Sequence, residues 1–283
     1  MTSVRYPTAQ DFYPGDLIAQ IKGFLAGFKI PDGLPEKISG MILPHAGWRY
    51  SGQTAARAIY CTSQTKTPDT CLIFGADHSG VAKHSLYPTG SWKTPLGDIQ
   101  VNTKLANDIS KSVNHLMVED SIAHQTEHSI EVQLPMIKYF WPETTIIPII
   151  VKPTKDSLEL GYAIGTLLRK SKEDVIGIAS TDLTHYGLMY GTVSHGIGVK
   201  GFKWMIQNDQ RMIQHFIACN SKKVLTEAQK NSNACGAGAV AALLAMMQNL
   251  GKDTGHLIDD TTSHGLNPLE KFTCGVGYAG VVY

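Results

Sequence analysis

The chain has 283 residues, of which 43% are hydrophobic and 17% are charged. This composition is sufficient for a buried core and excludes a disordered chain. With 25 basic and 24 acidic residues the formal net charge is only +1, so there is no electrostatic reason to expect binding to nucleic acid or to an anionic membrane. No run of 18 apolar residues predicts a transmembrane helix, and the N-terminal segment lacks the apolar core of a signal peptide.

The five cysteines are widely spaced, and no two of them form a C-x-x-C pair. An odd number without regular spacing is typical neither of a disulfide framework nor of a structural zinc site. The cysteines therefore predict a protein of the reducing cytoplasm. The eleven histidines are numerous for this length, so their positions are informative.

Short apolar runs alternate with amphipathic segments along the whole chain. Five of the runs lack the polar–apolar alternation of a one-sided strand. This is expected of strands that are buried on both faces of a mostly parallel sheet. The predicted strands cover residues 38–43, 70–74, 145–151, 175–179 and 276–282.

Helices are predicted between and around these strands. They cover residues 17–28 with Asp16 as N-cap, 51–63, 103–113, 129–140, 157–169 with Asp156 as N-cap, and 236–250. The last of them is apolar almost all round and is expected to be deeply buried. The alternation, without a repeat or a linker, predicts one α/β domain over residues 1–283, folded as a three-layer α/β/α sandwich.

Potential metal-binding residues follow three of the predicted strands. His45 lies in P-H-A-G-W-R-Y-S-G, His78 in G-A-D-H-S-G, and Asp182 and His185 in S-T-D-L-T-H-Y-G. Ligands of α/β sheets bind beyond the carboxyl ends of the strands, so these side chains are expected to meet in one cleft. Cys235 precedes the last predicted helix in N-A-C-G-A-G, where a helix N-terminus favours the thiolate.

Imidazole and thiolate are ligands of iron, copper and zinc, and two histidines with one anionic group leave positions open for a reactive centre. We therefore predict a metal site made of His45, His78 and Cys235, with Asp182 and His185 close by. Each residue alone is more typical of a structural role, because strand-end histidines are usually hydrogen-bonded and single cysteines are usually buried. The repetition at three strand ends favours a common site.

A second group of histidines lies in A-H-Q-T-E-H-S-I-E-V-Q-L-P at residues 123–135. Thr126 is a candidate N-cap that would place Glu127 and His128 in the first turn of the following helix. Two interpretations remain open: a solvated helix start, or acid–base and supporting groups that reach the same cleft. His264, in the turn-rich segment T-S-H-G-L-N-P, is interpreted as structural.

Seven segments together resemble the Memo family, which takes its name from a mediator of cell motility. They are P-H-A-G-W-R-Y-S-G, G-A-D-H-S-G, T-P-L-G-D at 94–98, E-H-S-I-E-V-Q-L-P, I-I-P-I-I-V at 146–151, S-T-D-L-T-H-Y-G and A-C-G-A-G. They follow one another in the order of the family from about residue 40 to the C-terminus.

The resemblance implies the LigB-like fold of the class III extradiol dioxygenases, which bind non-haem iron. The metal-binding positions of the family match His45, His78 and Cys235, with Asp182 and His185 in the same cleft. The dioxygenases have a carboxylate where this chain has Cys235. A thiolate changes the redox preference of the metal, so Fe(II) and Cu are both expected candidates, with Zn as a further one, and ring cleavage itself is in doubt.

The resemblance also implies partners. Prokaryotic relatives resemble one member of a three-part set, the AmmeMemoRadiSam system, with an AMMECR-type protein and a radical SAM protein, which suggests a radical-based modification of an unknown substrate. Animal relatives suggest instead an adaptor for phosphorylated peptides.

Two functions of different classes follow. In the first, an oxidoreductase binds Fe(II) or Cu through the predicted trio, Asp182 is a further ligand or orients water, and His185 and His128 serve as acid–base groups, with Glu127 as a further candidate. In the second, a binding module presents its histidines and Arg49 to an anionic peptide. A hydrolase with Cys235 as nucleophile and His185 as base is the least favoured alternative, because it leaves two histidines unused. The P-loop, G-x-S-x-G and H-E-x-x-H motifs are absent from the sequence.

Overall fold

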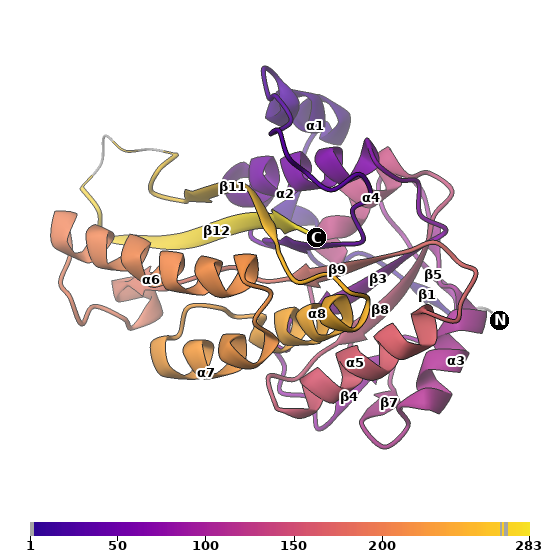
Figure 1. Ribbon diagram of the computed structural model, residues 1–283. Coiled ribbons are helices and arrows are strands. Elements are labelled where there is room, and N and C mark those ends of the chain that lie inside the picture. The colour runs from indigo at the N-terminus through magenta and orange to yellow at the C-terminus, as the bar shows by residue number, and fades with distance from the viewer. Residues whose placement is uncertain (1–2, 267, 269–270) are drawn as a thin grey trace.

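The centre of the fold is a nine-stranded mixed sheet, seen in the computed structural model, which describes residues 3–266, 268 and 271–283 (Figure 1). The strand order is β10-β12-β2-β9-β3-β8-β4-β7, and β11 also pairs with β12. The strands are β2 (Gly40–Leu43), β3 (Thr70–Gly75), β4 (His84–Leu86), β7 (Met117–Glu119), β8 (Thr145–Ile150), β9 (Val175–Ser180), β10 (His185–Gly187), β11 (His256–Thr262) and β12 (Cys274–Val282). All five predicted strands are present, with ends that differ by at most two residues.

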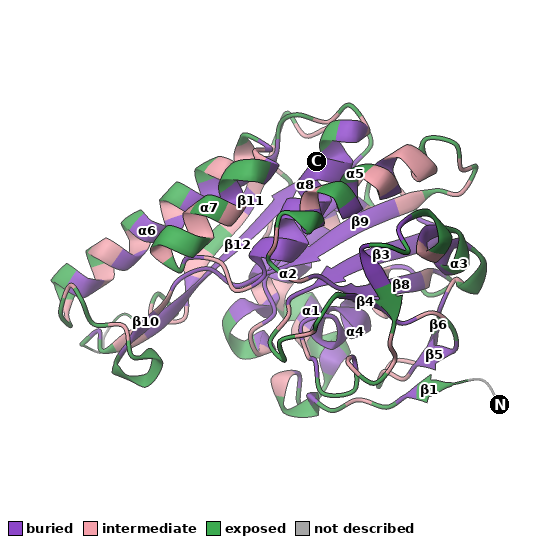
Figure 2. Cartoon of the chain, turned by 90° about the horizontal axis from the view of Figure 1, so that it is seen from below, coloured by how far each residue is buried: buried purple, intermediate pink, exposed green. Residues whose placement is uncertain are grey.

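Four neighbouring strands, β2, β9, β3 and β8, are parallel and almost entirely buried (Figure 2). Apolar runs without alternation produce this arrangement because both faces of the sheet are covered by helices. The flanks of the sheet are less regular than predicted: β12 runs antiparallel to β2, β10 and β11, and β4 runs antiparallel to β8. The α/β/α fold class is therefore confirmed, with a sheet that is parallel at its centre and mixed overall.

Helices cover both faces of the sheet, as Figures 1 and 2 show from two directions. One layer consists of α1 (Leu17–Leu25), α2 (Trp48–Ser63) and α4 (Leu134–Phe140), and the other of α3 (Thr103–Ser112), α5 (Asp156–Leu168), α6 (Val199–Ile217), α7 (Ser221–Asn231) and α8 (Ala237–Asn249). Helix α8 is buried at all but one position, as its apolar sequence predicted, and lies between α5 and α7. No helix of the described residues is both long and apolar enough to cross a membrane.

The helix predicted over residues 129–140 begins later than expected. Glu127 and His128 lie in an irregular segment, a 3-10 turn covers Glu131–Gln133, and α4 starts only at Leu134, so Thr126 does not cap a helix. The reason is tertiary: the carboxylate and carbonyl groups of this segment accept hydrogen bonds from distant parts of the chain. Asp16 caps α1 as predicted, by accepting a bond from the backbone N–H of Ala19, whereas Asp156 lies inside α5 and Lys155 is its N-cap.

A small three-stranded sheet, β1 (Val4–Arg5), β5 (Ser91–Trp92) and β6 (Ile99–Gln100), holds the N-terminal segment in place. From β1 the buried Arg5 donates to the carbonyl groups of His124 and Glu127 and forms an ion pair with Glu131 at 2.5 Å. Glu131 in turn accepts a hydrogen bond from Tyr13. These bonds position the loop that carries Glu127 and His128.

Candidate metal centre

Three loops bring polar side chains to the edge of the sheet where the parallel strands end. His45 follows β2, His78 follows β3 and Asp182 follows β9. The register places Leu43 beside Ser180, so two of the loops leave the sheet at the same level. The ring centroids of His45 and His78 lie 5.2 Å apart. The structure therefore brings together side chains that the sequence assigned to one cleft.

The potential ligand atoms in this cleft form two overlapping sets within the described residues. One set contains His45, His78 and His128, and the other contains His45, Asp182 and Cys235; within each set the atoms lie within 4.8 Å of one another. Because His45 belongs to both, the predicted trio is divided between the sets: His78 shares one with His45, and Cys235 shares the other. His128, predicted as an acid–base group, lies among the potential ligands.

His45 is buried and its ring orientation is defined by hydrogen bonds. Its Nδ1 lies 3.0 Å from Oγ of Ser180, and that hydroxyl donates to the carbonyl of Ser129 at 2.7 Å. Nδ1 therefore carries the proton and donates to Ser180, while Nε2 keeps a free lone pair directed at Sγ of Cys235, 3.3 Å away. Burial, with the neighbouring histidines, lowers the pKa of His45 well below its usual value, so the ring is neutral, the form that binds metals.

His78 is oriented by a carboxylate. Its Nδ1 lies 3.0 Å and 3.2 Å from the two oxygens of Glu127, which also accept from the backbone N–H groups of His78 and Ser129. The hydrogen bond to Glu127 raises the pKa of His78. Burial alone would raise the pKa of Glu127, but the bond and charge of His78 outweigh it and hold that pKa below its usual value. A carboxylate on Nδ1 leaves Nε2 free, the usual arrangement of a metal-binding histidine.

His128 stacks on His78, with ring centroids 4.7 Å apart and planes 14° from parallel. Its ring centroid also lies 4.9 Å from that of Phe12, and its Nδ1 lies 3.7 Å from Glu127. Burial lowers the pKa of His128, so it too is neutral near pH 7. The ring therefore contacts both an aromatic side chain and another imidazole, which limits its freedom to turn.

Cys235 lies immediately before α8, and its sulfur is surrounded by donors. The backbone N–H of Asp182 donates to Sγ at 3.2 Å, and the hydroxyl of Thr181 lies 3.9 Å from it. Burial, with the nearby charge of Asp182, raises the pKa of the Cys235 thiol, so the expectation that the helix start would favour the thiolate is wrong for the metal-free chain. For this thiol the cost of desolvating the thiolate outweighs the favourable effect of the helix dipole. A cation bound to the sulfur would reverse that result and favour the thiolate.

Asp182 and His185 continue the same loop. Asp182 Oδ1 accepts from the backbone N–H groups of His45 and Ala46 at 2.7 Å and 3.2 Å, and burial raises the pKa of its carboxyl group. His185 donates from Nδ1 to the carbonyl of Leu183 at 3.1 Å, and its ring packs edge-on against another aromatic ring. The sulfur of Cys235 contacts His45, and no contact between Cys235 and His185, the nucleophile and base of the hydrolase alternative, is present among the described residues.

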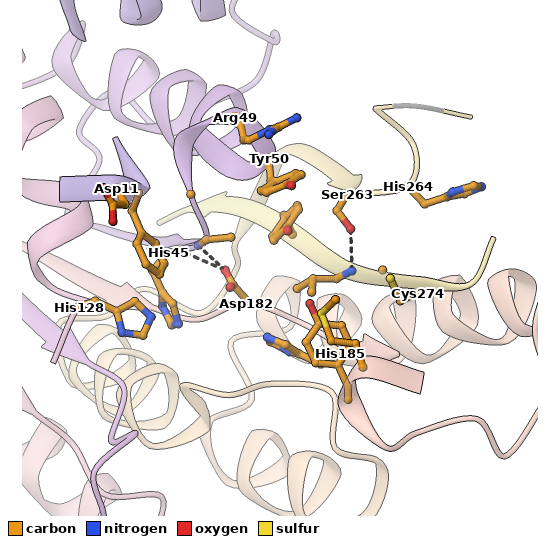
Figure 3. Close-up of a pocket in the computed structure, with 18 of the residues that line it drawn as sticks. Asp11, His45, Arg49, Tyr50, His128, Asp182, His185, Ser263, His264 and Cys274 are labelled. Carbon is orange, nitrogen blue, oxygen red and sulfur yellow. Dashed lines mark hydrogen bonds between the residues drawn. The ribbon is translucent and has the colours of Figure 1, made fainter. Parts of the chain in front are cut away.

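A cavity of about 840 Å³ opens over these residues and reaches from Asp11 to Cys274 (Figure 3). His45, His78, His128, Asp182 and His185 all line it, whereas Cys235 does not. Its lining also includes Ser263 and His264, which follow β11, and Arg49 and Tyr50 in the N-terminal turn of α2. The volume is that of a small-molecule site.

Several lining residues were not identified from the sequence. His264 was interpreted as structural; it does pack on Phe202 and Phe272, but it also lines the cavity. Tyr190 and Cys274 line it as well, and no motif pointed to them. Their positions follow from the pairing of β10 and β11 with β12, which places Cys274 opposite Gly187 in the register. The apolar runs of the sequence did not reveal this pairing.

The comparisons with known proteins agree with this architecture. The family model described as Memo-like protein matches residues 6–282. Two relatives described as MEMO1 family proteins, from Thermococcus onnurineus and Thermococcus kodakarensis, are 34% and 33% identical, and each alignment covers 99% of both chains. A MEMO1 family protein of Methanopyrus kandleri is 29% identical over 97% of this chain and 96% of its own.

Among solved structures, the uncharacterized protein JW3007 from Escherichia coli K12 superposes with a TM-score of 0.55. The alignment covers 87% of this chain and 99% of that one, at 8% identity. Such a likeness concerns the fold alone, and it agrees with the α/β architecture expected from the sequence. The match over nearly the whole chain, together with full-length relatives above 30% identity, means that the chain belongs to the Memo family.

Proposed function

We propose that this protein is a metal-dependent oxidoreductase that binds iron or copper at the end of the sheet and acts on a small molecule or peptide in the adjoining cavity. The observation that carries the proposal is the double donor set centred on His45, with Cys235 on one side and His78 on the other. Both histidines have Nδ1 engaged by a hydrogen bond, as metal-binding histidines do, and Nε2 of His45 lies beside Sγ of Cys235.

The distance between His45 and Cys235 fits a common ion. Ligands held at about 2.0–2.3 Å from one metal lie roughly 3–3.6 Å from each other, and Nε2 of His45 and Sγ of Cys235 are separated by 3.3 Å. Imidazole with thiolate favours iron, copper or zinc over magnesium or calcium. This pair therefore supports Fe(II) or Cu, with Zn as a further candidate, held by His45 and Cys235, and the proposal adds His78 from the second donor set as the third ligand.

Bound there, iron or copper would supply redox chemistry, and zinc only polarisation of a bound group. The residues of the chain supply the rest. Asp182 anchors the His45 loop through two backbone N–H groups and has a carboxyl group available to the ion or to a bound water. His185 lines the cavity with Nδ1 engaged, so its Nε2 is the group that can accept or return a proton of the substrate. His128 and Glu127 keep His78 in place and are further acid–base candidates.

Partners and compartment follow from the same proposal. A chain that uses a thiolate ligand needs that thiol in reduced form, and all five cysteines are free, which supports a cytoplasmic location. An AMMECR-type protein and a radical SAM protein are the proposed partners, in keeping with the family. They would connect the site to a radical-based modification.

A cobalt titration tests the donor set. Co(II) added to the metal-free protein is expected to give a near-ultraviolet thiolate-to-cobalt charge-transfer band that disappears in Cys235→Ser. The matched control is Cys274→Ser, because Cys274 lines the cavity beside His45 and His78 but belongs to neither donor set. A band that survives in Cys235→Ser, or no band in the unmodified protein, would refute the proposed ligand set.

A second candidate function is a module that binds anionic or phosphorylated peptides in the same cavity. It is favoured by Arg49, which is exposed, lines the cavity and forms no ion pair with any residue that the structure describes. Calorimetry with a phosphotyrosine peptide, before and after chelation, separates the two functions. Binding that persists without metal and weakens in Arg49→Gln supports the module, and binding that disappears with the metal supports the enzyme.

A further inference from the structure

A second cavity, of about 730 Å³, lies on the helical side of the site, among α5, α7 and the start of α8. Figure 1 shows α8 between the other two helices. Of all the residues in the two donor sets, only Cys235 lines this cavity, and the two cavities share no lining residue. Cys235 therefore connects the two regions: it lines the second cavity, and its sulfur contacts His45, which lines the first.

The walls of the second cavity combine apolar surface with positive charge. Leu158, Leu225 and Ala228 contribute apolar side chains, and Lys155 and Lys222 contribute ammonium groups. Both lysines are exposed, and neither forms an ion pair with a residue that the structure describes. The lining residues include no carboxylate. A ligand that complements this lining has an apolar body and one negative charge.

We propose that this cavity binds a small amphiphilic carboxylate, with its head group between Lys155 and Lys222 and its chain along Leu158 and Leu225, in contact with Cys235. The volume lies within the range of about 300–1,000 Å³ that is usual for small-molecule sites. Such a ligand covers Cys235 from the side opposite to His45, without entering the histidine-lined cavity. The proposal concerns a different space from the candidate metal centre and holds whether or not a metal binds there.

Octanoate is the probe, and the metal-free full-length protein is the sample. Calorimetry is expected to show saturable binding of octanoate that weakens about tenfold in the double variant Lys155→Gln/Lys222→Gln. The matched control is Lys223→Gln/Lys230→Gln, which removes the same charge from exposed positions of α7 that do not line the cavity. Ala228→Trp, which fills the space, is expected to abolish binding.

Alkylation with N-ethylmaleimide, resolved by mass spectrometry, places the ligand. Octanoate is expected to slow the labelling of Cys235 several-fold and to leave Cys274, in the other cavity, unchanged. Absence of saturable binding, equal affinity in the two double lysine variants, protection of Cys274 instead of Cys235, or a Cys235 that never reacts would each overturn the proposal. If Cys235→Ser loses the cobalt band but still binds octanoate, the metal site and the octanoate site are independent, and each proposal is tested by its own measurement.

Discussion

The sulfur of Cys235 lies 3.3 Å from Nε2 of His45, although 190 positions separate the two residues in the chain. His45 is placed by the end of a central parallel strand, and Cys235 by the start of the most deeply buried helix. Both anchors belong to the core, so the contact is held from two sides. Two side chains placed in this way can bind an ion without rearrangement of the fold.

Glu127→Gln tests how His78 is supported. The substitution keeps the shape of the side chain but removes the charge that raises the pKa of His78. We expect the pKa of His78 in the metal-free protein to fall, followed by NMR titration of its ring. We also expect metal affinity to fall by about 10–100-fold, as for other carboxylates behind a metal-binding histidine.

Glu159→Gln is the matched control, because Glu159 also bonds to a histidine, His115, but on the exposed surface. It should leave metal affinity unchanged. Equal affinity of the Glu127→Gln variant and the unmodified protein would show that His78 is not a ligand held by this carboxylate.

Arg5→Met tests the N-terminal anchor. Arg5 is buried, pairs with Glu131 and lies over the ring of Trp92. Its removal leaves a buried carboxylate without its partner, so we expect a loss of about 3–5 kcal/mol in the free energy of unfolding, measured with urea.

The control for this anchor is Arg57→Met. Arg57 also pairs with a carboxylate, Asp259 at 3.2 Å, and lies over an aromatic ring, but the pair is partly solvated. Its loss should cost about 1 kcal/mol or less. Similar losses of unfolding free energy in the two variants would mean that the buried Arg5–Glu131 pair stabilises the fold no more than the partly solvated Arg57–Asp259 pair does.

Asp209→Asn tests a pH dependence of stability. Burial raises the pKa of Asp209 to about 7, and its carboxyl group accepts from the backbone N–H of Thr184. The pKa of an aspartate in the unfolded chain is about 4. Between about pH 4 and pH 7 the folded chain therefore keeps a proton on Asp209 that the unfolded chain releases. Its contribution to stability is therefore complete below about pH 4 and is lost as the pH rises through 7.

The asparagine variant should remove this dependence. Between pH 5 and pH 8 the drop in unfolding free energy should be smaller than in the unmodified protein, by about 1–3 kcal/mol. Asp108→Asn, on the exposed surface of α3, should leave the drop as it was. An identical pH profile for Asp209→Asn would contradict a buried, protonated Asp209.

Gly161→Ala tests the packing of α5 on α8. A Cβ at Gly161 would meet the carbonyl oxygen of Ala242 at 1.9 Å, so the helices would have to separate. We expect a loss of about 1–3 kcal/mol in unfolding free energy. Gly23→Ala in α1, where a Cβ meets nothing within 4 Å, should instead stabilise by about 0.5–1 kcal/mol. If Gly161→Ala leaves the free energy of unfolding unchanged, the close approach of α5 and α8 is contradicted.

The central strands and the meeting of His45 with His78 were predictable, because both depend on short-range patterns. An uninterrupted apolar run marks a buried strand wherever it occurs, and parallel strands end at a common edge. The burial of α8 followed in the same way from its apolar sequence.

Other parts of the site depend on contacts between distant segments. The backbone around Glu127 follows hydrogen bonds to His78, 49 positions away, and Glu131 pairs with Arg5 across 126 positions, so helix propensity misplaced the start of α4. The antiparallel direction of β12 follows from its partners rather than from its residues. That pairing brings His264 to the cavity, which its turn-rich sequence alone did not indicate.

Metal content is the most direct test of the account. Protein produced without a histidine tag should contain about one equivalent of iron, copper or zinc by mass spectrometry of the elements, as expected for a site with one ion. Cys235→Ser and His45→Ala should each lose most of it, whereas Cys274→Ser should keep it. An unmodified protein without these metals even after anaerobic loading with Fe(II) or Cu(I), or an undiminished content in Cys235→Ser, would contradict the account.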